Sequence, residues 1–388
     1  MKPEPQVPGP GLPPVDLIVF GEDWGAHPSS TGHLIRHLAE GRRVVWVNSI
    51  GMRAPRLDRS DLARVFTKLR GAAGRTRAPQ TPRATPLGPI VQPLVLPMAR
   101  SALGRAINRA LLARSVGAAA KRAGLHKPVL WLSLPSAVDA IDAIEHSAVV
   151  YYCGDDFSAL AGVDHAAAAA MERELVARAD LILAASPLLA SRFPTGKTRL
   201  LEHGVDLDLF TRPVPPAPDL PKGKVAGFYG ALAPWIDTGL LRDVAGLLPD
   251  WRFLFIGPVK TDVSAISGLD NVTLLGARPH NELASYSQHW TAGMIPFHDN
   301  AQIRASNPLK LREYLAAGRP VVATPFPAMQ PYRAGIRVAT TARDFADALV
   351  AAAEDGDAGT VERQYLVAGE SWTARAAEAS KLIENLPA

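Results

Sequence analysis

The sequence predicts an α/β protein with two parallel-sheet domains, and three observations support this prediction. Its 388 residues, 47% of them hydrophobic, can form two hydrophobic cores. Short β-branched runs alternate with helical stretches along the chain, as expected for parallel strands joined by crossover helices. The alternation stops in residues 211–221, where five prolines disfavour helix and sheet interior alike. We therefore place the domain boundary there.

The predicted division of the chain follows from this boundary. It consists of a disordered tail (1–14), a first Rossmann-like domain (15–208), a Pro-rich linker (209–223), a second Rossmann-like domain (224–365) and a final helical segment (366–388). We expect the final helix to pack back on the first domain. Ligands of open parallel sheets bind beyond the carboxyl ends of the strands, so we expect the two domains to face each other across one cleft.

Individual elements are predicted from apolar runs, capping residues and glycines. The predicted strands are 16–21, 43–48, 129–132, 149–153 and 179–186 in the first domain, and 225–229, 251–256, 272–275, 293–295 and 321–324 in the second. The predicted helices are 29–39, 101–123, 165–178, 237–248, 281–288, one that starts at Pro308, and 372–386.

The composition of the chain indicates in which cellular compartment the protein is expected. The single cysteine, Cys153, cannot form an internal disulfide, which favours a reducing compartment. The N-terminal residues lack the apolar region of a signal peptide, and no run approaches the 18 apolar residues of a spanning helix. We therefore expect a cytoplasmic protein that is soluble or peripheral to the membrane.

The segment 53–114 is rich in arginine and predicts a basic surface. Its interspersed leucines, Val65 and Phe66 favour an anionic membrane as the partner of this surface. Nucleic acid is not expected as a partner, because the chain is only 6% aromatic and no stacking motif accompanies the arginines. A plain solvated basic face remains the structural alternative.

The stretch 306–318 is the most informative motif. Ser306 or Asn307 is the expected N-cap, Pro308 suits the first helical position, and Gly318 ends the helix. A helix N-terminus favours an anion such as phosphate, and Lys310 adds a full charge in the first turn. Leu309 and Lys310 lie in the first turn of the expected helix. Glu313 follows Lys310 by three residues and is therefore expected on the same face of the helix as Lys310. An ordinary surface Lys–Glu pair is the alternative reading.

Residues 307–324 resemble the donor-binding helix of family 4-like (group 1) glycosyltransferases with the GT-B fold. The resemblance extends over most of residues 145–330, through His203-Gly-Val-Asp206, Gly230 after the first strand of the second domain, 249–257 and 271–286. It implies that the second domain binds a nucleotide sugar and the first binds the acceptor. It further implies that Lys310 contacts the donor diphosphate, that Glu313 contacts the ribose, and that residues 277–281, including Arg278, border the nucleobase.

One departure from the family pattern bears on mechanism. Retaining members usually carry two glutamates eight residues apart, but Ala305 stands eight residues before Glu313. The loop that starts at Gly230 also lacks the basic residues expected there. The chain therefore looks closer to inverting, membrane-associated transferases of exopolysaccharide and teichuronic-acid type, such as the xanthan glucuronosyltransferase group. A UDP-sugar is favoured over a GDP-sugar as donor, with no cofactor and no metal.

Two carboxylates, Asp155 and Asp156, follow the predicted strand 149–153. An inverting transfer needs one general base for the acceptor hydroxyl, and we assign Asp155 to this role with Asp156 as the second candidate. Two alternatives remain, because an Asp pair after a strand also caps helices and turns, and Asp-rich motifs hold metals in other transferases.

Three residues after the first strand are candidates for acceptor binding. Asp23, Trp24 and Gly25 offer a polar group, an aromatic plate and a close backbone approach, although a turn and a packing residue are the alternative. The ten histidines show no metal-ligand spacing, and His298 is the one most expected to touch the donor.

Together these features predict a transferase that moves a sugar from a nucleotide-diphosphate sugar to a hydroxyl of a lipid-linked or polysaccharide acceptor. It would act at the inner face of the plasma membrane. Lys310 and the helix N-terminus would stabilise the leaving diphosphate. Two other functions remain open: a nucleotide-sugar epimerase on the same fold, and a non-catalytic protein that binds a nucleotide sugar or docks at the membrane. A nicotinamide oxidoreductase is disfavoured, since no Gly-rich fingerprint is present.

Overall fold

The structure is a computed structural model that describes residues 14–25, 29–50, 87–96, 101–159 and 164–386. Contacts divide the chain into two compact units. The first consists of Met1–Cys153, Gly162–Leu183 and Ala376–Ala388, and the second of Gly154–Ala161 and Ala184–Arg375.

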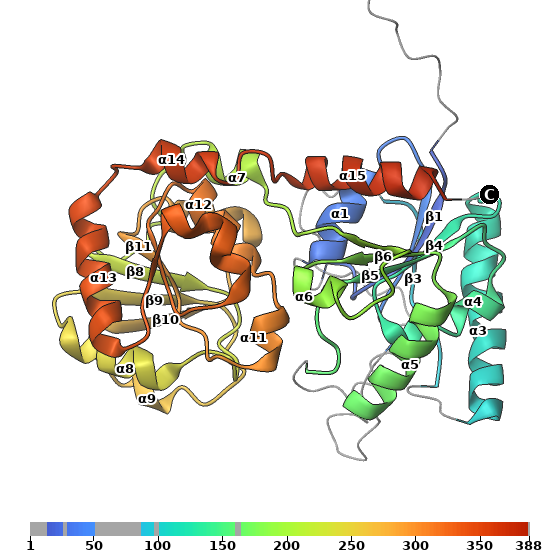
Figure 1. Cartoon of the computed structure of the whole chain (residues 1–388), viewed down its shortest axis with the longest axis horizontal. Helices are drawn as coiled ribbons and strands as arrows, with labels where there is room; N and C mark the ends of the chain where they lie inside the picture. The colour runs from blue at the N-terminus through green and yellow to red at the C-terminus, as the bar shows by residue number, and fades with distance from the viewer. Residues whose placement is uncertain (1–13, 26–28, 51–86, 97–100, 160–163, 387–388) are drawn as a thin grey trace, which may run out of the picture. The chain divides into compact units, whose positions relative to one another are not determined.

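The described residues form two sheets, and the strand pairs in both are parallel (Figure 1). The first sheet has the order β3-β2-β1-β4-β5-β6-β7, with β1 (Leu17–Phe20), β2 (Val44–Val47), β3 (Ile90–Val91), β4 (Val129–Leu132), β5 (Val149–Cys153), β6 (Leu181–Ala184) and β7 (Thr198–Leu200). The second has the order β10-β9-β8-β11-β12-β13, with β8 (Val225–Tyr229), β9 (Arg252–Ile256), β10 (Val272–Gly276), β11 (Ala292–Ile295), β12 (Val321–Ala323) and β13 (Ile336–Val338).

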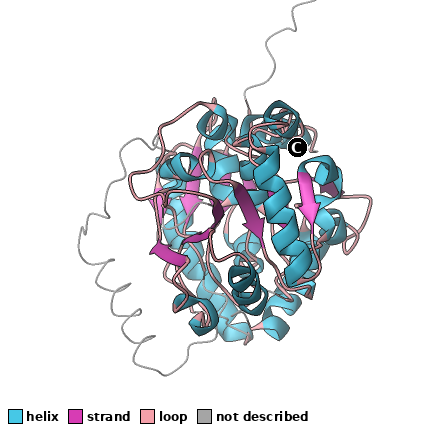
Figure 2. Cartoon of the chain, turned by 90° about the vertical axis from the view of Figure 1, so that its left-hand side faces the viewer, coloured by secondary structure: helices cyan, strands magenta, loops and turns pink. Residues whose placement is uncertain are grey.

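Helices connect the strands and surround them on more than one side (Figure 2). The α-helices are α1 (Ser30–Leu38), α3 (Ala102–Arg122), α4 (Ala140–Ala143), α5 (His165–Arg178), α6 (Pro187–Ala190), α7 (Leu207–Thr211), α8 (Thr238–Leu247), α9 (Ser264–Ser267), α10 (Ala284–Ser287), α11 (Ala301–Ala305), α12 (Leu309–Ala316), α13 (Ala342–Asp355), α14 (Thr360–Tyr365) and α15 (Trp372–Glu384). Three 3-10 helices are η1 (Pro135–Ala137), η2 (His280–Glu282) and η3 (Pro327–Gly335).

Side-chain caps fix where many of these helices start. Ser29 accepts a hydrogen bond from the backbone of α1, Asp164 from α5 and Asp237 from α8. Such caps satisfy backbone N–H groups that have no partner within the helix. The caps follow the carboxyl ends of strands or the loops beyond them, so they set the positions of helix N-termini at that edge of each sheet.

Helix α12 is held close to the second sheet by aromatic packing over glycines. A Cβ atom at Gly227 would lie 1.6 Å from the ring of Trp290, and one at Gly293 would lie 2.4 Å from the ring of Tyr314. The Tyr314 hydroxyl accepts a hydrogen bond from the backbone N–H of Tyr229 at 3.1 Å. The ring centroids of Trp290 and Tyr314 are 5.1 Å apart. This packing fixes α12 against β8 and β11.

Most predicted elements are confirmed, several of them residue for residue. The strands 129–132, 149–153 and 225–229 and the helix 165–178 have the predicted bounds. Three short strands, β3, β7 and β13, are missing from the prediction. The helix predicted at 281–288 is wrong in form, because the structure contains η2 and the four-residue helix α10 instead.

The last helix, α15, begins in the second unit and belongs to the first unit from Ala376 onward. Within the first unit, the guanidinium of Arg42 contacts the hydroxyl of Ser380 and, at 3.4 Å, the carboxylate of Glu384. These contacts anchor the end of α15 beside the turn between α1 and β2.

The basic segment 53–114 lies largely outside the described residues, which resume at 87–96 and 101–159. Two of its described arginines are neutralised on α3. Arg105 pairs with Asp139 at 2.7 Å and with Glu174 at 2.8 Å, and Arg109 pairs with Asp142 at 3.2 Å. Among the described helices, none is long and apolar enough to cross a membrane.

Candidate functional site

The ammonium group of Lys310 lies in an aromatic setting at the start of α12. Its Nζ is 5.3 Å from the ring centroid of Phe228 and 5.7 Å from that of Phe297. Burial lowers the pKa of Lys310, and the nearby carboxylate of Glu313 partly opposes this shift. Lys310 forms no ion pair with a carboxylate of the described residues. A cation held this way at a helix N-terminus is suited to bind an anion.

The loop that follows β8 leaves room for this cation. Gly230 has a φ of +129°, and a Cβ atom there would lie 3.2 Å from Nζ of Lys310. Gly257, which follows β9, packs against Gly230: a Cβ atom at Gly257 would lie 2.0 Å from the carbonyl oxygen of Gly230. The structure thus places Gly230, which the resemblance includes, directly beside Lys310.

The start of α12 differs from the prediction in one respect. Neither Ser306 nor Asn307 caps the helix: the N-cap position is Pro308, which has no side-chain hydrogen bond to the helix, and Leu309 is the first helical residue. The Ser306 hydroxyl instead donates to the carbonyl of Ile303 at the end of α11. Uncapped N–H groups at this helix start remain available to another acceptor.

Asn307 does not cap the helix because its side chain forms hydrogen bonds with other residues. Its amide donates to the carbonyl of Ala185 at 2.7 Å, and its amide oxygen accepts from Arg312. Its own carbonyl contacts Nδ1 of His203 at 2.7 Å. Burial lowers the pKa of His203 to about 4, so the ring is neutral near pH 7. These contacts fix the backbone immediately before Lys310.

Arg312 is the centre of this buried network. Its side chain is fully buried, its Nε donates to Glu370 at 2.7 Å, and its guanidinium lies 5.2 Å from the ring centroid of Tyr332. Tyr332 donates its own hydroxyl hydrogen to Glu370 at 2.6 Å. Gly318, with φ of +75°, ends α12 as predicted. The helix is thus fixed at both ends.

Glu313 lies on the next part of α12 and is buried. Its Oε1 is 3.0 Å from Nε2 of His280, the first residue of η2. The structure therefore brings the residue expected at the ribose next to the loop 277–281 expected at the nucleobase.

Arg278 in that loop is engaged by the chain around it. Its guanidinium donates to Asp219 at 2.9 Å and to the carbonyl of Leu275 at 2.9 Å, and its Nε donates to Tyr286 at 3.3 Å. The Tyr286 hydroxyl donates to Asp219 at 2.6 Å, and these hydrogen bonds from Tyr286 and Arg278 lower the pKa of Asp219. Arg278 thus holds the loop to the Pro-rich segment.

His298 follows β11 and lies beside the loop after β8. Its Nδ1 is 3.4 Å from the carboxylate of Asp237, and its backbone N–H donates to the carbonyl of Trp235 at 2.8 Å. About half of its side chain is exposed. His298 therefore joins two of the loops at the carboxyl edge of the second sheet.

The two aspartates after β5 differ in their surroundings. Asp156 accepts hydrogen bonds from the backbone and hydroxyl of Ser158 and lies 2.5 Å from Arg192. Burial alone would raise the pKa of Asp156, but the hydrogen bonds from Ser158 and Arg192 outweigh it and lower the pKa. Asp156 thus has the partners of a turn-forming residue, as in the structural alternative. Asp155 is exposed.

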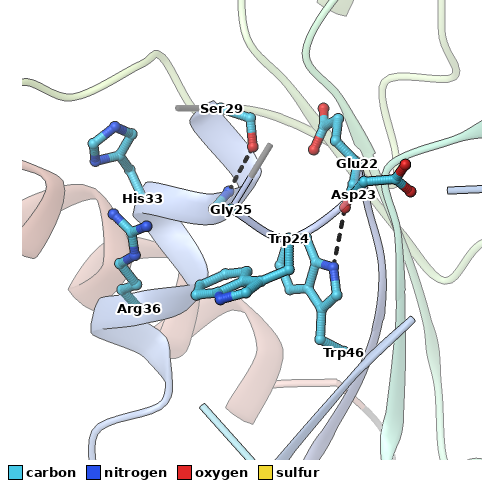
Figure 3. A pocket seen from close by; sticks show the side chains of 9 residues that line it. Glu22, Asp23, Trp24, Gly25, Ser29, His33, Arg36 and Trp46 are labelled. Carbon is cyan, nitrogen blue, oxygen red and sulfur yellow. Dashed lines mark hydrogen bonds between the residues drawn. The ribbon is translucent and has the colours of Figure 1, made fainter. Parts of the chain in front are cut away.

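The residues after β1 line a depression in the first unit (Figure 3). Asp23 accepts from the backbone and hydroxyl of Ser49 at 3.0 and 2.7 Å, so it shapes the loop. Trp24 lies edge-on to Trp46, at 4.8 Å between ring centroids, and the guanidinium of Arg36 lies 5.1 Å from its centroid. Gly25, with φ of +79°, also lines the depression. Part of the Trp24 face is therefore covered by Arg36.

Sequence reasoning missed three residues of these sites: His280, Asp219 and Glu370. His280 was quoted only within a loop, and the other two lie far in sequence from the residues they bind. Among the described residues, no group of three or more His, Cys, Asp or Glu side chains is arranged to hold a metal.

The second unit contains a parallel sheet of Rossmann-like form, and beyond its strands a half-buried cation lies at an uncapped helix start, an arrangement that suits an anionic ligand. Residues 223–355 match the model of the family described as "Glycosyl transferases group 1". This domain therefore belongs to the group 1 glycosyltransferases, and the resemblance to family 4-like members is confirmed.

The chain is similar to many solved structures, among them Anabaena HepE and a sucrose-phosphate synthase, and to a curated protein. Anabaena HepE, in complex with UDP and glucose, has a TM-score of 0.69 at 14% identity, over 96% of this chain and 100% of HepE. Sucrose-phosphate synthase from Thermosynechococcus elongatus has a TM-score of 0.67 at 17% identity, over 96% and 99%. These likenesses confirm the GT-B fold with two Rossmann-like domains.

The curated protein is TuaH of Bacillus subtilis (strain 168), which is named as a glycosyltransferase of teichuronic acid biosynthesis. It is 30% identical over 221 residues, which are 51% of this chain and 55% of TuaH. The alignment thus spans about half of the length of each protein.

Proposed function

We propose that the protein transfers a sugar from a UDP-sugar to a hydroxyl group of a lipid-linked or polysaccharide acceptor, with inversion at the anomeric carbon. The observation that carries this proposal is Lys310, a cation among aromatic rings at the uncapped start of α12, within a group 1 glycosyltransferase domain. Such a group can neutralise the diphosphate that leaves during transfer, without a metal.

The donor would bind at the second domain, residues 224–365. Lys310 and the backbone around Pro308 and Leu309 would contact the diphosphate, and Gly230 would allow its close approach. Glu313 would accept hydrogen bonds from the ribose hydroxyls. The loop that contains Arg278 would border the base, and His298 would lie at the sugar. HepE is named in complexes with UDP and with UDP-glucose, which supports uridine as the base.

The acceptor would bind at the first domain, residues 15–208, with Asp23, Trp24 and Gly25 at its site. In the transfer step the acceptor oxygen attacks the anomeric carbon while the bond from that carbon to the diphosphate oxygen breaks. Asp155 takes the proton of the acceptor hydroxyl, and UDP leaves with the bonding electron pair. Asp156, with its pKa lowered, is the weaker base and is left to hold the turn.

A lipid-linked acceptor would be available at the inner face of the plasma membrane, and we propose that the reaction takes place there. We propose that the basic segment 53–114 contacts anionic lipid, although Arg105 and Arg109 are already paired with carboxylates. The name of TuaH, which refers to teichuronic acid, supports a cell-envelope polysaccharide as the acceptor.

A donor panel tests the proposal. Release of UDP from UDP-glucose, UDP-galactose, UDP-glucuronate and UDP-N-acetylglucosamine is measured with and without octyl glycosides as acceptors. We expect one donor to release UDP in an acceptor-dependent way, and proton NMR of the product to show an inverted anomeric configuration. Conversion of the donor sugar without an acceptor would instead identify an epimerase.

A further inference from the structure

His280 and Glu313 form a hydrogen-bonded pair in the second unit. The Nε2 atom of His280 is 3.0 Å from Oε1 of Glu313, and the exposed fractions of the two side chains are 19% and 10%. An ionised carboxylate only accepts hydrogen bonds, so Nε2 carries the hydrogen and donates it. A hydrogen bond to a charged acceptor away from bulk water is among the stronger ones in proteins.

The orientation of the His280 ring is fixed by packing. The edge of the ring meets Phe210, with centroids 5.7 Å apart and an interplanar angle of 78°. Phe210 is fully buried and stacks on Tyr229, the last residue of β8. The imidazole therefore rests on a rigid surface that continues into the second sheet.

The backbone that carries His280 is fixed as well. Arg278, two residues earlier, is held by Asp219 and by the carbonyl of Leu275. The backbone N–H of Leu283 donates to the carbonyl of His280 at 3.2 Å and closes the turn η2. The donor nitrogen of His280 thus has little freedom relative to α12.

From this geometry we propose that His280 is a positioning residue for donor recognition, a role that rests on the proposed function. By binding Oε1, His280 holds the carboxylate of Glu313 in one orientation, with Oε2 directed at the ribose diol of the bound nucleotide. A glutamate side chain has three rotatable bonds, so a fixed carboxylate binds a diol with a smaller loss of conformational entropy.

The charges around Glu313 are consistent with this role. Lys310 lies one turn before it on α12, close enough for the Glu313 carboxylate to influence the pKa of Lys310. Without the hydrogen bond from His280, the carboxylate could turn toward this ammonium group. In this proposal His280 keeps the Glu313 carboxylate away from the Lys310 ammonium group. The carboxylate is then available to the ribose and the ammonium group to the diphosphate.

The inference is tested by comparing how two nucleotides, with and without the ribose hydroxyls, bind to the wild type and to variants of His280. Calorimetry measures the dissociation constants of UDP and of 2′,3′-dideoxy-UDP for the wild type, His280→Ala, His280→Gln and the control His289→Ala. His289 is exposed, and its Nε2 hydrogen-bonds the carbonyl of Val214. The two ligands differ only in the ribose hydroxyls, so their affinity ratio isolates recognition of the diol.

We expect the wild type and His289→Ala to prefer UDP by about tenfold or more, as for hydrogen bonds to a charged group. His280→Ala should lose most of this preference while its affinity for the dideoxy nucleotide changes little. His280→Gln, which keeps an N–H donor, should restore part of the preference.

Two results would overturn the inference. If His280→Ala weakens both nucleotides equally, His280 only stabilises the fold. If His280→Ala keeps the full preference for UDP, Glu313 needs no support from His280. Absence of any UDP binding by the wild type would instead contradict the proposed function, so the two failures are distinguishable.

Discussion

Gly230 leaves the space that Lys310 occupies: a Cβ atom on Gly230 would lie 3.0 Å from Cε and 3.2 Å from Nζ of Lys310. The φ of +129° at Gly230 is also one that other residues rarely adopt. The position of the ammonium group therefore depends on a glycine that lies 80 residues earlier in the chain.

We predict that Gly230→Ala weakens UDP binding by about tenfold or more, because it displaces a charge-assisted hydrogen bond to the diphosphate. Gly223→Ala is the matched control, since Gly223 has φ of +95° and no atom within 4 Å of its Cβ position. The control should lose some stability and keep its affinity for UDP. Equal affinities of both variants, measured by calorimetry, would show that the space beside Lys310 is unimportant.

Arg312 and Glu370 supply a prediction about stability. Removal of one partner of a buried ion pair costs about 3–5 kcal/mol, so Arg312→Met should destabilise the protein by about this amount. Arg343→Met removes an exposed pair with Asp347, at 3.2 Å, and should change the stability by less than about 1 kcal/mol. Urea unfolding of the two variants measures both values, and similar losses would contradict a special role of the buried network.

The pKa of His203 leads to a prediction about pH. It is about 4 in the folded protein and 6.5 without burial, so the unfolded chain binds a proton first as the pH falls. The contribution of neutral His203 to stability is complete above pH 6.5 and is lost progressively toward pH 4. The loss between pH 7 and pH 5 should be about 2 kcal/mol.

His203→Asn is the matched variant, because an asparagine amide can still donate to the carbonyl of Asn307 but does not titrate. Its unfolding free energy should depend less on pH between 7 and 5 than that of the wild type. An unchanged pH dependence would mean that other groups determine acid stability.

The two aspartates after β5 should behave differently on substitution. Asp155→Asn removes the proposed base and should lower the transfer rate by about 10²- to 10⁴-fold while leaving UDP affinity intact. Asp156→Asn weakens the contact with Arg192 and should mainly lower stability. A larger rate loss in Asp156→Asn, at equal stability, would assign the base to Asp156.

The sequence predicted the fold where local patterns decide the structure. Fully buried strands such as β4, β5 and β8 are continuous apolar runs, which is why their bounds were predictable. The missed strands β3 and β7 are two and three residues long and largely exposed, so they have no such pattern. The β-pairing that makes them strands depends on neighbours in the sheet.

The sequence predicted which residues belong to the candidate site better than it predicted the contacts that these residues make. The motif around Lys310 and Glu313 identified the helix and its charges. The role of Asn307 was misassigned, because Arg312 donates to its amide oxygen, the atom that a helix cap would use, while its amide nitrogen donates to the carbonyl of Ala185. Contacts over 122 residues of chain, such as that of Asn307 with Ala185, are set by the packing of the whole domain.

The central claim is that Lys310 at the start of α12 binds the diphosphate of a uridine nucleotide. The most direct measurement is the dissociation constant of UDP, without added metal, for the wild type, Lys310→Ala and the exposed control Lys222→Ala. We predict that the wild type and Lys222→Ala bind alike and that Lys310→Ala binds more weakly by about 30-fold or more, since loss of a desolvated charge pair costs about 2–5 kcal/mol. Equal binding by all three proteins, or no binding of UDP by the wild type, would contradict the account.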